Sequence, residues 1–252
     1  MVPAPAENVY ATSKKIKFAQ YWLSRQSEKL GREVKVLDFG CGNGEELARY
    51  IVSETIDYTG IDIHLPSLEH ARAELGNDKA VFLSEVPDGE KYDVIIMSEV
   101  LEHLDEPVEI LKRLVPKLRS DGIFICSVPN GYGLTEIEKY VDAKLRLYKA
   151  LRWAKRKIAG RHNEGPSVMD VPYNYESGHV QFYTKCSLRR VVQKAGLDFK
   201  AFQNGSLMGA DLTGATIFLF KPLIKLNTCI ADFLPFWAVA TWHFVLCRSE
   251  EK

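Results

Sequence analysis

One stretch near the start of the chain limits its fold more than any other. Residues 34–39 form an apolar run interrupted only by polar Lys35 and Asp38, and Gly40, Gly42 and Gly44 follow with the spacing G-x-G-x-G. A helical pattern begins at about residue 45. A buried strand, a tight glycine turn and a helix start form a nucleotide-type cradle in open α/β sheets. Glycine allows the sharp turn and lets a ligand lie against the backbone.

The acid in this stretch narrows the ligand. Asp38 stands two residues before Gly40; a diphosphate has no use for a carboxylate there, whereas a ligand with a free ammonium group does. The alternative is an ordinary glycine-rich turn between a strand and a helix. The stretch resembles motif I of the class I S-adenosylmethionine (SAM) methyltransferases, whose usual form is hhD-h-G-x-G-x-G. That resemblance implies that Asp38, Gly40, Cys41 and Gly42 contact SAM.

Composition excludes several other classes of protein. The 252 residues are 46% hydrophobic, which is ample for a packed core, and the net charge of zero points to neither nucleic acid nor membrane. The five cysteines are odd in number, widely spaced and without C-x-x-C, so neither structural zinc nor a disulfide framework is expected. No signal peptide is recognised at the N-terminus. We therefore expect a cytoplasmic protein, and its oligomeric state is left open.

Apolar runs alternate with helical patterns along most of the chain, which predicts an α/β fold with a doubly wound, mostly parallel sheet. The resemblance implies a Rossmann-like sheet of seven strands whose last strand inserts antiparallel beside strand six. We expect a single domain over 1–252, with a helical segment at 1–33 and a helical insertion at 131–177. Strands are expected at 34–38, 56–62, 80–83, 92–98, 123–128, 197–203 and 240–248, and helices at 13–30, 45–52, 66–75, 109–118, 184–195 and 222–234. Ser13 and Thr184 are the expected N-caps of two of these helices.

Further residues expected to bind the cofactor follow the other strands. Asp62 lies 24 residues after Asp38, about where a ribose-binding carboxylate is expected, because one carboxylate can accept from both ribose hydroxyls. The alternative is a surface acid at a strand end. Ile63 would press on the adenine. Ser84 follows strand three, where the family often has Asp instead, and Ser98 ends strand four.

The segment after strand four carries the candidate catalytic chemistry. The sequence S-E-V-L-E-H-L-D-E-P begins at Ser98 and resembles the post-strand-four motif of the ubiquinone-pathway O-methyltransferases and of many small-molecule methyltransferases. His103 in this segment, or His179 after the insertion, is the candidate general base, because a histidine pKa lies near neutrality. The alternative is that each is a polar residue at a helix or loop end. Asn130 and Tyr183 are candidate substrate contacts.

The same segment also suggests a metal site. Glu99, Glu102 and His103 are spaced i, i+3 and i+4, which would place them on one helix face. With His179 they form a set suited to magnesium or manganese, and the pattern resembles the metal site of the RNA 3′-terminal 2′-O-methyltransferases and of the ubiquinone O-methyltransferases. The alternative is that no metal binds and Glu102 faces solvent.

The insertion has two interpretations. Lys139 to Arg161 contain nine basic residues and one acid, and apolar positions recur along 134–161. Such a helix can lie on an anionic membrane surface, or it can form a lid whose apolar face covers the substrate pocket.

Together these features predict SAM-dependent O-methylation of a small-molecule, glycan or lipid-linked acceptor by direct displacement, with a histidine general base and S-adenosylhomocysteine (SAH) as product. One alternative is an RNA ribose 2′-O-methyltransferase with a divalent metal, which the lack of a recognisable RNA-binding module and of net positive charge disfavours. The other is a SAM-binding partner protein without catalysis.

Overall fold

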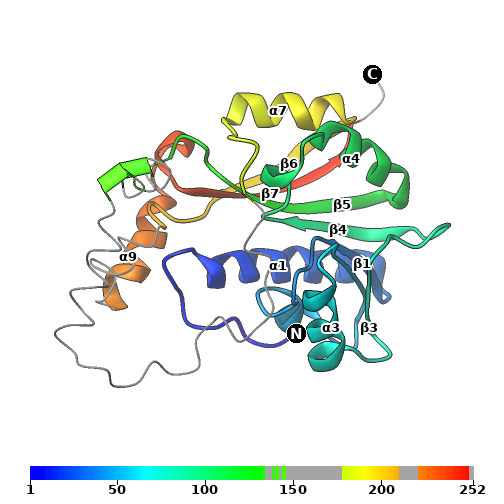
Figure 1. Ribbon diagram of the computed structural model, residues 1–252. Coiled ribbons are helices and arrows are strands. Elements are labelled where there is room, and N and C mark those ends of the chain that lie inside the picture. The colour runs from blue at the N-terminus through cyan, green and yellow to red at the C-terminus, as the bar shows by residue number, and fades with distance from the viewer. Residues whose placement is uncertain (134–137, 139, 142–143, 146–177, 210–220, 250–252) are drawn as a thin grey trace.

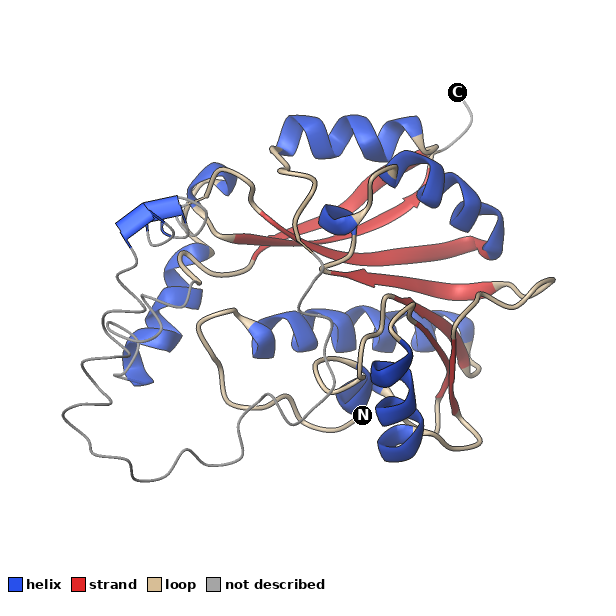
Figure 2. Cartoon of the chain, in the orientation of Figure 1, coloured by secondary structure: helices blue, strands red, loops and turns tan. Residues whose placement is uncertain are grey.

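The computed structural model describes residues 1–133, 138, 140–141, 144–145, 178–209 and 221–249. These residues form a seven-stranded sheet in the order β3-β2-β1-β4-β5-β7-β6 (Figure 2). Pairing is parallel from β3 through β5, whereas β7 is antiparallel to both of its neighbours. The predicted sheet and its antiparallel last strand are therefore confirmed. The strands are β1 Val34–Phe39, β2 Ile56–Ile61, β3 Ala80–Leu83, β4 Tyr92–Ser98, β5 Leu118–Pro129, β6 Leu197–Asn204 and β7 Thr241–Arg248.

Helices cover both faces of the sheet. On one face pack α1 (Thr12–Leu30), α2 (Ala48–Ile51) and α3 (Leu65–Leu75), and on the other pack α4 (Pro107–Leu114) and α7 (Lys185–Lys194) (Figure 1). A further helix, α9 (Lys221–Ala231), precedes the last strand, and short 3₁₀ turns lie at Leu101–His103, Val115–Lys117 and Phe236–Ala238. None of the described helices is both long and apolar enough to cross a membrane.

Strand alternation divides the core into two layers. Val36 and Ile96 point toward α1, whereas Leu37 and Ile95 point toward α4 and α7, and all four are fully buried. This is why the central strands read as continuous apolar runs in the sequence. Polar side chains lie where the parallel strands end, at the C-terminal edge of the sheet.

Two local predictions are wrong. The helix expected at 45–52 shortens to α2, because residues 43–47 form turns. Ser13 is not the N-cap of α1: the helix begins at Thr12, and the backbone N–H groups of Ser13 and Lys14 donate to the carboxylate of Glu7. Thr184 does cap α7, in a capping box with Ser187. Most of the insertion, including both interpretations of 134–161, lies outside the described residues.

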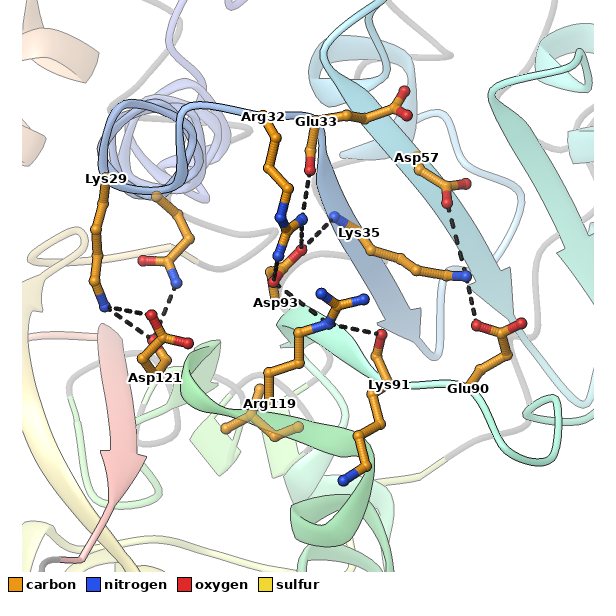
Figure 3. A network of polar contacts seen from close by, with 12 residues as sticks. Lys29, Arg32, Glu33, Lys35, Asp57, Glu90, Lys91, Asp93, Arg119 and Asp121 are labelled. Atoms are coloured by element: carbon orange, nitrogen blue, oxygen red, sulfur yellow. Dashed lines mark hydrogen bonds and ion pairs between the residues drawn. The ribbon is translucent and has the colours of Figure 1, made fainter.

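A network of charged side chains lies at the other end of the central strands, where β1 and β4 begin (Figure 3). Asp93, 1% exposed, accepts two hydrogen bonds from the Arg32 guanidinium at 2.7 and 2.8 Å and one from the Lys35 backbone at 2.9 Å. Arg119 lies 3.6 Å from the same carboxylate. The network joins the α1–β1 loop to β4 and β5, so it stabilises the frame at the end away from the glycine loop.

Candidate functional site

The glycine loop after β1 has the backbone that the sequence predicts. Gly40, Gly42 and Gly44 have φ values of 83°, 55° and 77°, a region that other residues rarely adopt. A Cβ on Gly40 would lie 2.5 Å from Cγ2 of Val100, whereas one on Gly42 would meet no atom within 4 Å. Gly40 is therefore needed for packing against the segment after β4. Gly42 leaves open space where a ligand can approach.

Asp62 is bound to this loop. It is the first residue after β2, and its Oδ2 accepts from the backbone N–H of Gly42 at 2.8 Å while Oδ1 accepts from that of His64 at 2.8 Å. Each carboxylate oxygen has a further lone pair for a ligand hydroxyl. The neighbouring Ile63 is 86% exposed, so an apolar surface lies open beside the acid.

Asp38 is buried at the end of β1. It is 2% exposed, and its Oδ2 accepts a hydrogen bond from the hydroxyl of Tyr58 at 2.7 Å. Burial raises the pKa of Asp38 to about 7, although the bond from Tyr58 and the charge of Lys15 oppose the rise. A carboxylate that is costly to ionise gains most from a cationic ligand. Tyr58 was not predicted as a site residue, although its position in the strand next to β1 could have indicated it.

The remaining predicted cofactor residues lie at the same edge. Cys41 is half-buried with Sγ 3.6 Å from the Gly42 carbonyl oxygen, and burial raises the pKa of its thiol. Ser84 is exposed directly after β3. Ser98 ends β4, and its Oγ lies 3.1 Å from that of Ser127. The parallel strands thus bring together residues that are far apart in the sequence.

The structure corrects the prediction for Glu99. Its φ of 56° lies outside the helical region, and the 3₁₀ turn covers only Leu101–His103. Its Oε1 accepts from the hydroxyl of Ser127 at 2.6 Å. Glu99, Glu102 and His103 therefore do not share a helix face. Ser127 was missed by the sequence reasoning, although a serine near the end of strand five was a signal for it.

Glu102, His103 and His179, the other three residues of the predicted metal site, lie close together. The rings of His103 and His179 meet edge to face at an angle of 70°, with centroids 5.0 Å apart. Ligand atoms of Glu102, His103 and His179 all lie within 4.8 Å of one another. Glu102 is fully buried, so the expectation that it faces solvent is wrong. Its carbonyl oxygen accepts from the backbone of Val180 and Gln181, which holds the returning chain beside His103.

A hydrogen bond defines the tautomer of His103. Its Nδ1 lies 3.1 Å from the carbonyl oxygen of Gly178, and a carbonyl only accepts, so Nδ1 carries a proton. In the neutral ring Nε2 then has a free lone pair. This nitrogen lies 3.9 Å from Oε1 of Glu102.

The two predicted substrate residues both have structural partners. Tyr183 is 3% exposed, and its hydroxyl donates to the carbonyl oxygen of Leu101 at 3.0 Å. Asn130 donates from Nδ2 to the carbonyl oxygens of Trp237 and Val239 at 3.0 and 2.7 Å. Both side chains hold loops around the sheet edge.

Comparison with known proteins supports this interpretation of the fold. A family described as a methyltransferase domain matches residues 12–200. The mitochondrial ubiquinone biosynthesis O-methyltransferase of Candida albicans is 33% identical over 107 residues, which is 38% of this chain and 32% of that protein. The ubiquinone biosynthesis O-methyltransferase of Vibrio vulnificus is 30% identical over 140 residues, which is 52% of this chain and 57% of that protein. The match thus spans about a third to just over half the length of these curated relatives.

A solved structure shares the fold over nearly the whole chain. The plantazolicin methyltransferase BpumL in complex with SAH aligns with a TM-score of 0.53 and 17% identity, and the alignment covers 94% of this chain and 84% of that one. At this identity the similarity concerns the fold alone. It supports the Rossmann-like arrangement around the glycine loop.

Proposed function

The chain belongs to the methyltransferase-domain family, and we propose that it is a SAM-dependent enzyme that methylates an oxygen of a small-molecule, glycan or lipid-linked acceptor. When bound, SAM supplies a methyl group on a sulfonium that is already activated for displacement. The protein then has to hold this cofactor, align the acceptor and remove the proton of its hydroxyl. The residues at the sheet edge divide these tasks.

The chemistry of these residues fits the cofactor. Asp62 offers lone pairs to the ribose hydroxyls, and the exposed Ile63 offers an apolar surface to the adenine. Asp38 is a buried acid suited to the ammonium group. Gly42 leaves the space that a side chain would fill. Cys41, Ser84 and Ser98 lie at the same edge of the sheet and are the remaining candidate contacts to SAM.

The contact between Gly40 and Val100 carries the proposal. It joins the glycine loop to the segment after β4, and the backbone N–H of His103 donates to the carbonyl oxygen of Val100 at 2.9 Å. The backbone of His103 and the glycine loop are therefore parts of one packed unit. Such a unit can align an acceptor with the cofactor.

His103 is the preferred general base. Its Nδ1–H is fixed on the Gly178 carbonyl oxygen, so Nε2 can accept the acceptor proton. The carboxylate of Glu102 would stabilise the resulting imidazolium. His179 lies against the ring and would orient it or share the proton.

The direct test is transfer of a labelled methyl group from SAM into a fractionated extract of the source organism. Wild-type protein is compared with His103→Gln and with Asp62→Ala. We expect label in one fraction with wild type and loss of label with both variants. Label in the organic phase would indicate a lipid-linked acceptor and a membrane contact through 134–161, whereas aqueous label would favour the lid. Equal labelling by all three proteins would contradict the assigned roles.

A divalent cation is a second candidate for activating the acceptor hydroxyl, because the ligand atoms of Glu102, His103 and His179 lie within 4.8 Å of one another. Carboxylate and imidazole ligands suit manganese or magnesium, which would lower the pKa of a bound hydroxyl. The test is activity after chelator treatment, followed by addition of each cation. Full activity without any cation would remove the metal from the proposal and leave the histidine base.

A further inference from the structure

The backbone of Glu99 is held in an unfavourable conformation. Its φ is 56°, and among the described residues Ala11 is the only other non-glycine residue with a positive φ. Such a conformation is strained for a residue with a side chain, and it concentrates at functional sites. It persists here because the backbone N–H of Glu99 donates to the carbonyl oxygen of Ser127 at 3.1 Å, with the Ser127 hydroxyl at 3.2 Å. The neighbouring strand β5 therefore fixes Glu99 in place.

The carboxylate of Glu99 is held through only one of its oxygens. Ser127 donates to Oε1 at 2.6 Å, a length typical of a charge-assisted bond. Ser127 is 2% exposed and is itself contacted by Ser98 at 3.1 Å. Oε2 has no hydrogen bond or ion pair with any described residue. Glu99 is half-buried, so a fixed negative oxygen remains available to a ligand.

Glu99 also lies beside the glycine loop. Strand β4 pairs with β1, with Asp38 opposite Ile96, and the residue after Glu99 is Val100, which contacts Gly40. Asp62, Asp38 and Glu99 thus stand at the ends of three adjacent strands, β2, β1 and β4. The cofactor site proposed above is lined by three acids, and the first two have assigned partners.

The difference in charge between cofactor and product suggests the partner of the third acid. SAM and SAH share the adenosine and the amino-acid group, so Asp62 and Asp38 meet groups that both molecules have. Only SAM has the sulfonium, whose positive charge disappears when the methyl group leaves. A fixed carboxylate in a half-buried site attracts such a charge more strongly than it would in water.

We propose that the carboxylate of Glu99 faces the sulfonium of the bound cofactor, so that the site binds SAM more tightly than SAH. The inference rests on the proposed function, and it concerns how this chain distinguishes SAM from SAH. Ser127 supports it by holding the carboxylate.

The test is binding, which needs no acceptor. Dissociation constants for SAM, SAH and sinefungin, an analogue with an ammonium in place of the sulfonium, are measured by titration calorimetry for wild type and Glu99→Gln. Glutamine keeps the size and the bond from Ser127 but removes the charge. We expect the constants for SAM and sinefungin to rise about tenfold, the change that about 1.4 kcal/mol produces, and that for SAH to change less than about threefold.

Two further variants make the result decisive. Asp62→Ala removes a contact that both ligands share, so it should weaken SAM and SAH equally. Ser127→Ala keeps the charge but frees the carboxylate, so it should lower the preference for SAM less than Glu99→Gln does. Thermal melting shows whether each variant is folded. Equal weakening of SAM and SAH by Glu99→Gln, or no weakening, overturns the inference and leaves the proposed function intact. Failure of wild type to bind either ligand overturns both.

Discussion

The hydroxyl of Tyr58 donates a hydrogen bond to Oδ2 of Asp38 over 2.7 Å, and both residues are buried. This bond is the one hydrogen bond that the described residues give to the Asp38 carboxylate. Burial raises the pKa of Asp38 by more than this bond lowers it, so that the pKa is about 7. Asp38 therefore changes between its protonated and its ionised form near neutral pH, which affects both SAM binding and folding stability.

The first prediction concerns the pH dependence of SAM binding. The ammonium group is attracted to ionised Asp38, and below pH 7 the carboxyl of the free protein is increasingly protonated. We expect the dissociation constant for SAM to be about tenfold higher at pH 6 than at pH 8. Calorimetric titrations across this range check it, with Asp38→Asn as the control that binds weakly at every pH. A wild-type constant that does not change with pH would contradict the assigned role.

The second prediction concerns folding stability. Asp38 has a folded pKa of about 7 against an ordinary value of 3.8, so between these values the folded protein binds a proton that the unfolded chain has lost. The free energy of unfolding then falls as pH rises through this window. Asp38→Asn removes the penalty and should raise the free energy of unfolding by up to about 4 kcal/mol at pH 8, and by little at pH 4. Urea denaturation measures both values, with exposed Asp78→Asn as the matched control.

The glycine loop offers a test of packing. Gly31 and Gly40 have φ values of 62° and 83°, so alanine is strained at both, but only on Gly40 would a Cβ meet another side chain, Val100, at 2.5 Å. Gly40→Ala should therefore destabilise the protein by about 1–3 kcal/mol more than Gly31→Ala and also weaken SAM binding. Adding Val100→Ala should recover part of the loss. Equal melting temperatures for the two glycine variants would show that the contact is unimportant.

The sequence was sufficient for the sheet because its signals are local. Fully buried parallel strands read as continuous apolar runs, and the glycines and Thr184 mark turns and a helix start. The place of Asp62 beside the glycine loop was also predictable, because parallel strands bring their ends to one edge. Its ribose contact, like the other cofactor and catalytic assignments, stays a prediction.

The errors arose where contacts with residues outside the helical pattern overrule that pattern. Ser13 suits an N-cap, but Glu7 supplies a carboxylate to the same backbone groups and the helix begins earlier. Glu99 has helical spacing to His103, yet its bonds to Ser127 hold it at a φ of 56°. Glu7 precedes the helix and Ser127 lies on another strand, so helical periodicity indicates neither contact.

The histidine pair leads to a kinetic prediction. If His103 removes the acceptor proton, His103→Gln should lower kcat about 10²–10⁴-fold with a smaller change in the KM for SAM. His179→Gln should lower kcat less, because His179 orients the base. The pH profile of kcat should lose its histidine-dependent limb in His103→Gln alone. A limb that persists in that variant and disappears in His179→Gln would reverse the two roles.

The network in Figure 3 predicts how the fold responds to loss of a charge. Burial alone would raise the pKa of Asp93, but the hydrogen bonds from Arg32 and the Lys35 backbone hold it below its usual value. Arg32→Ala leaves this buried carboxylate with fewer partners, so we expect it to lower the free energy of unfolding at pH 7.

A lowered folded pKa contributes stability above the unfolded value, and that stability is lost as pH falls through the folded pKa. Wild type should therefore lose more stability between pH 5 and about pH 3 than Arg32→Ala does, because the variant has already lost the bond. Urea denaturation at the two pH values measures the difference. Arg25→Ala is the matched control, because Arg25 is exposed and its contact with Glu28 is 3.9 Å long. Equal acid sensitivity of wild type and Arg32→Ala would mean that Arg32 does not set the pKa of Asp93.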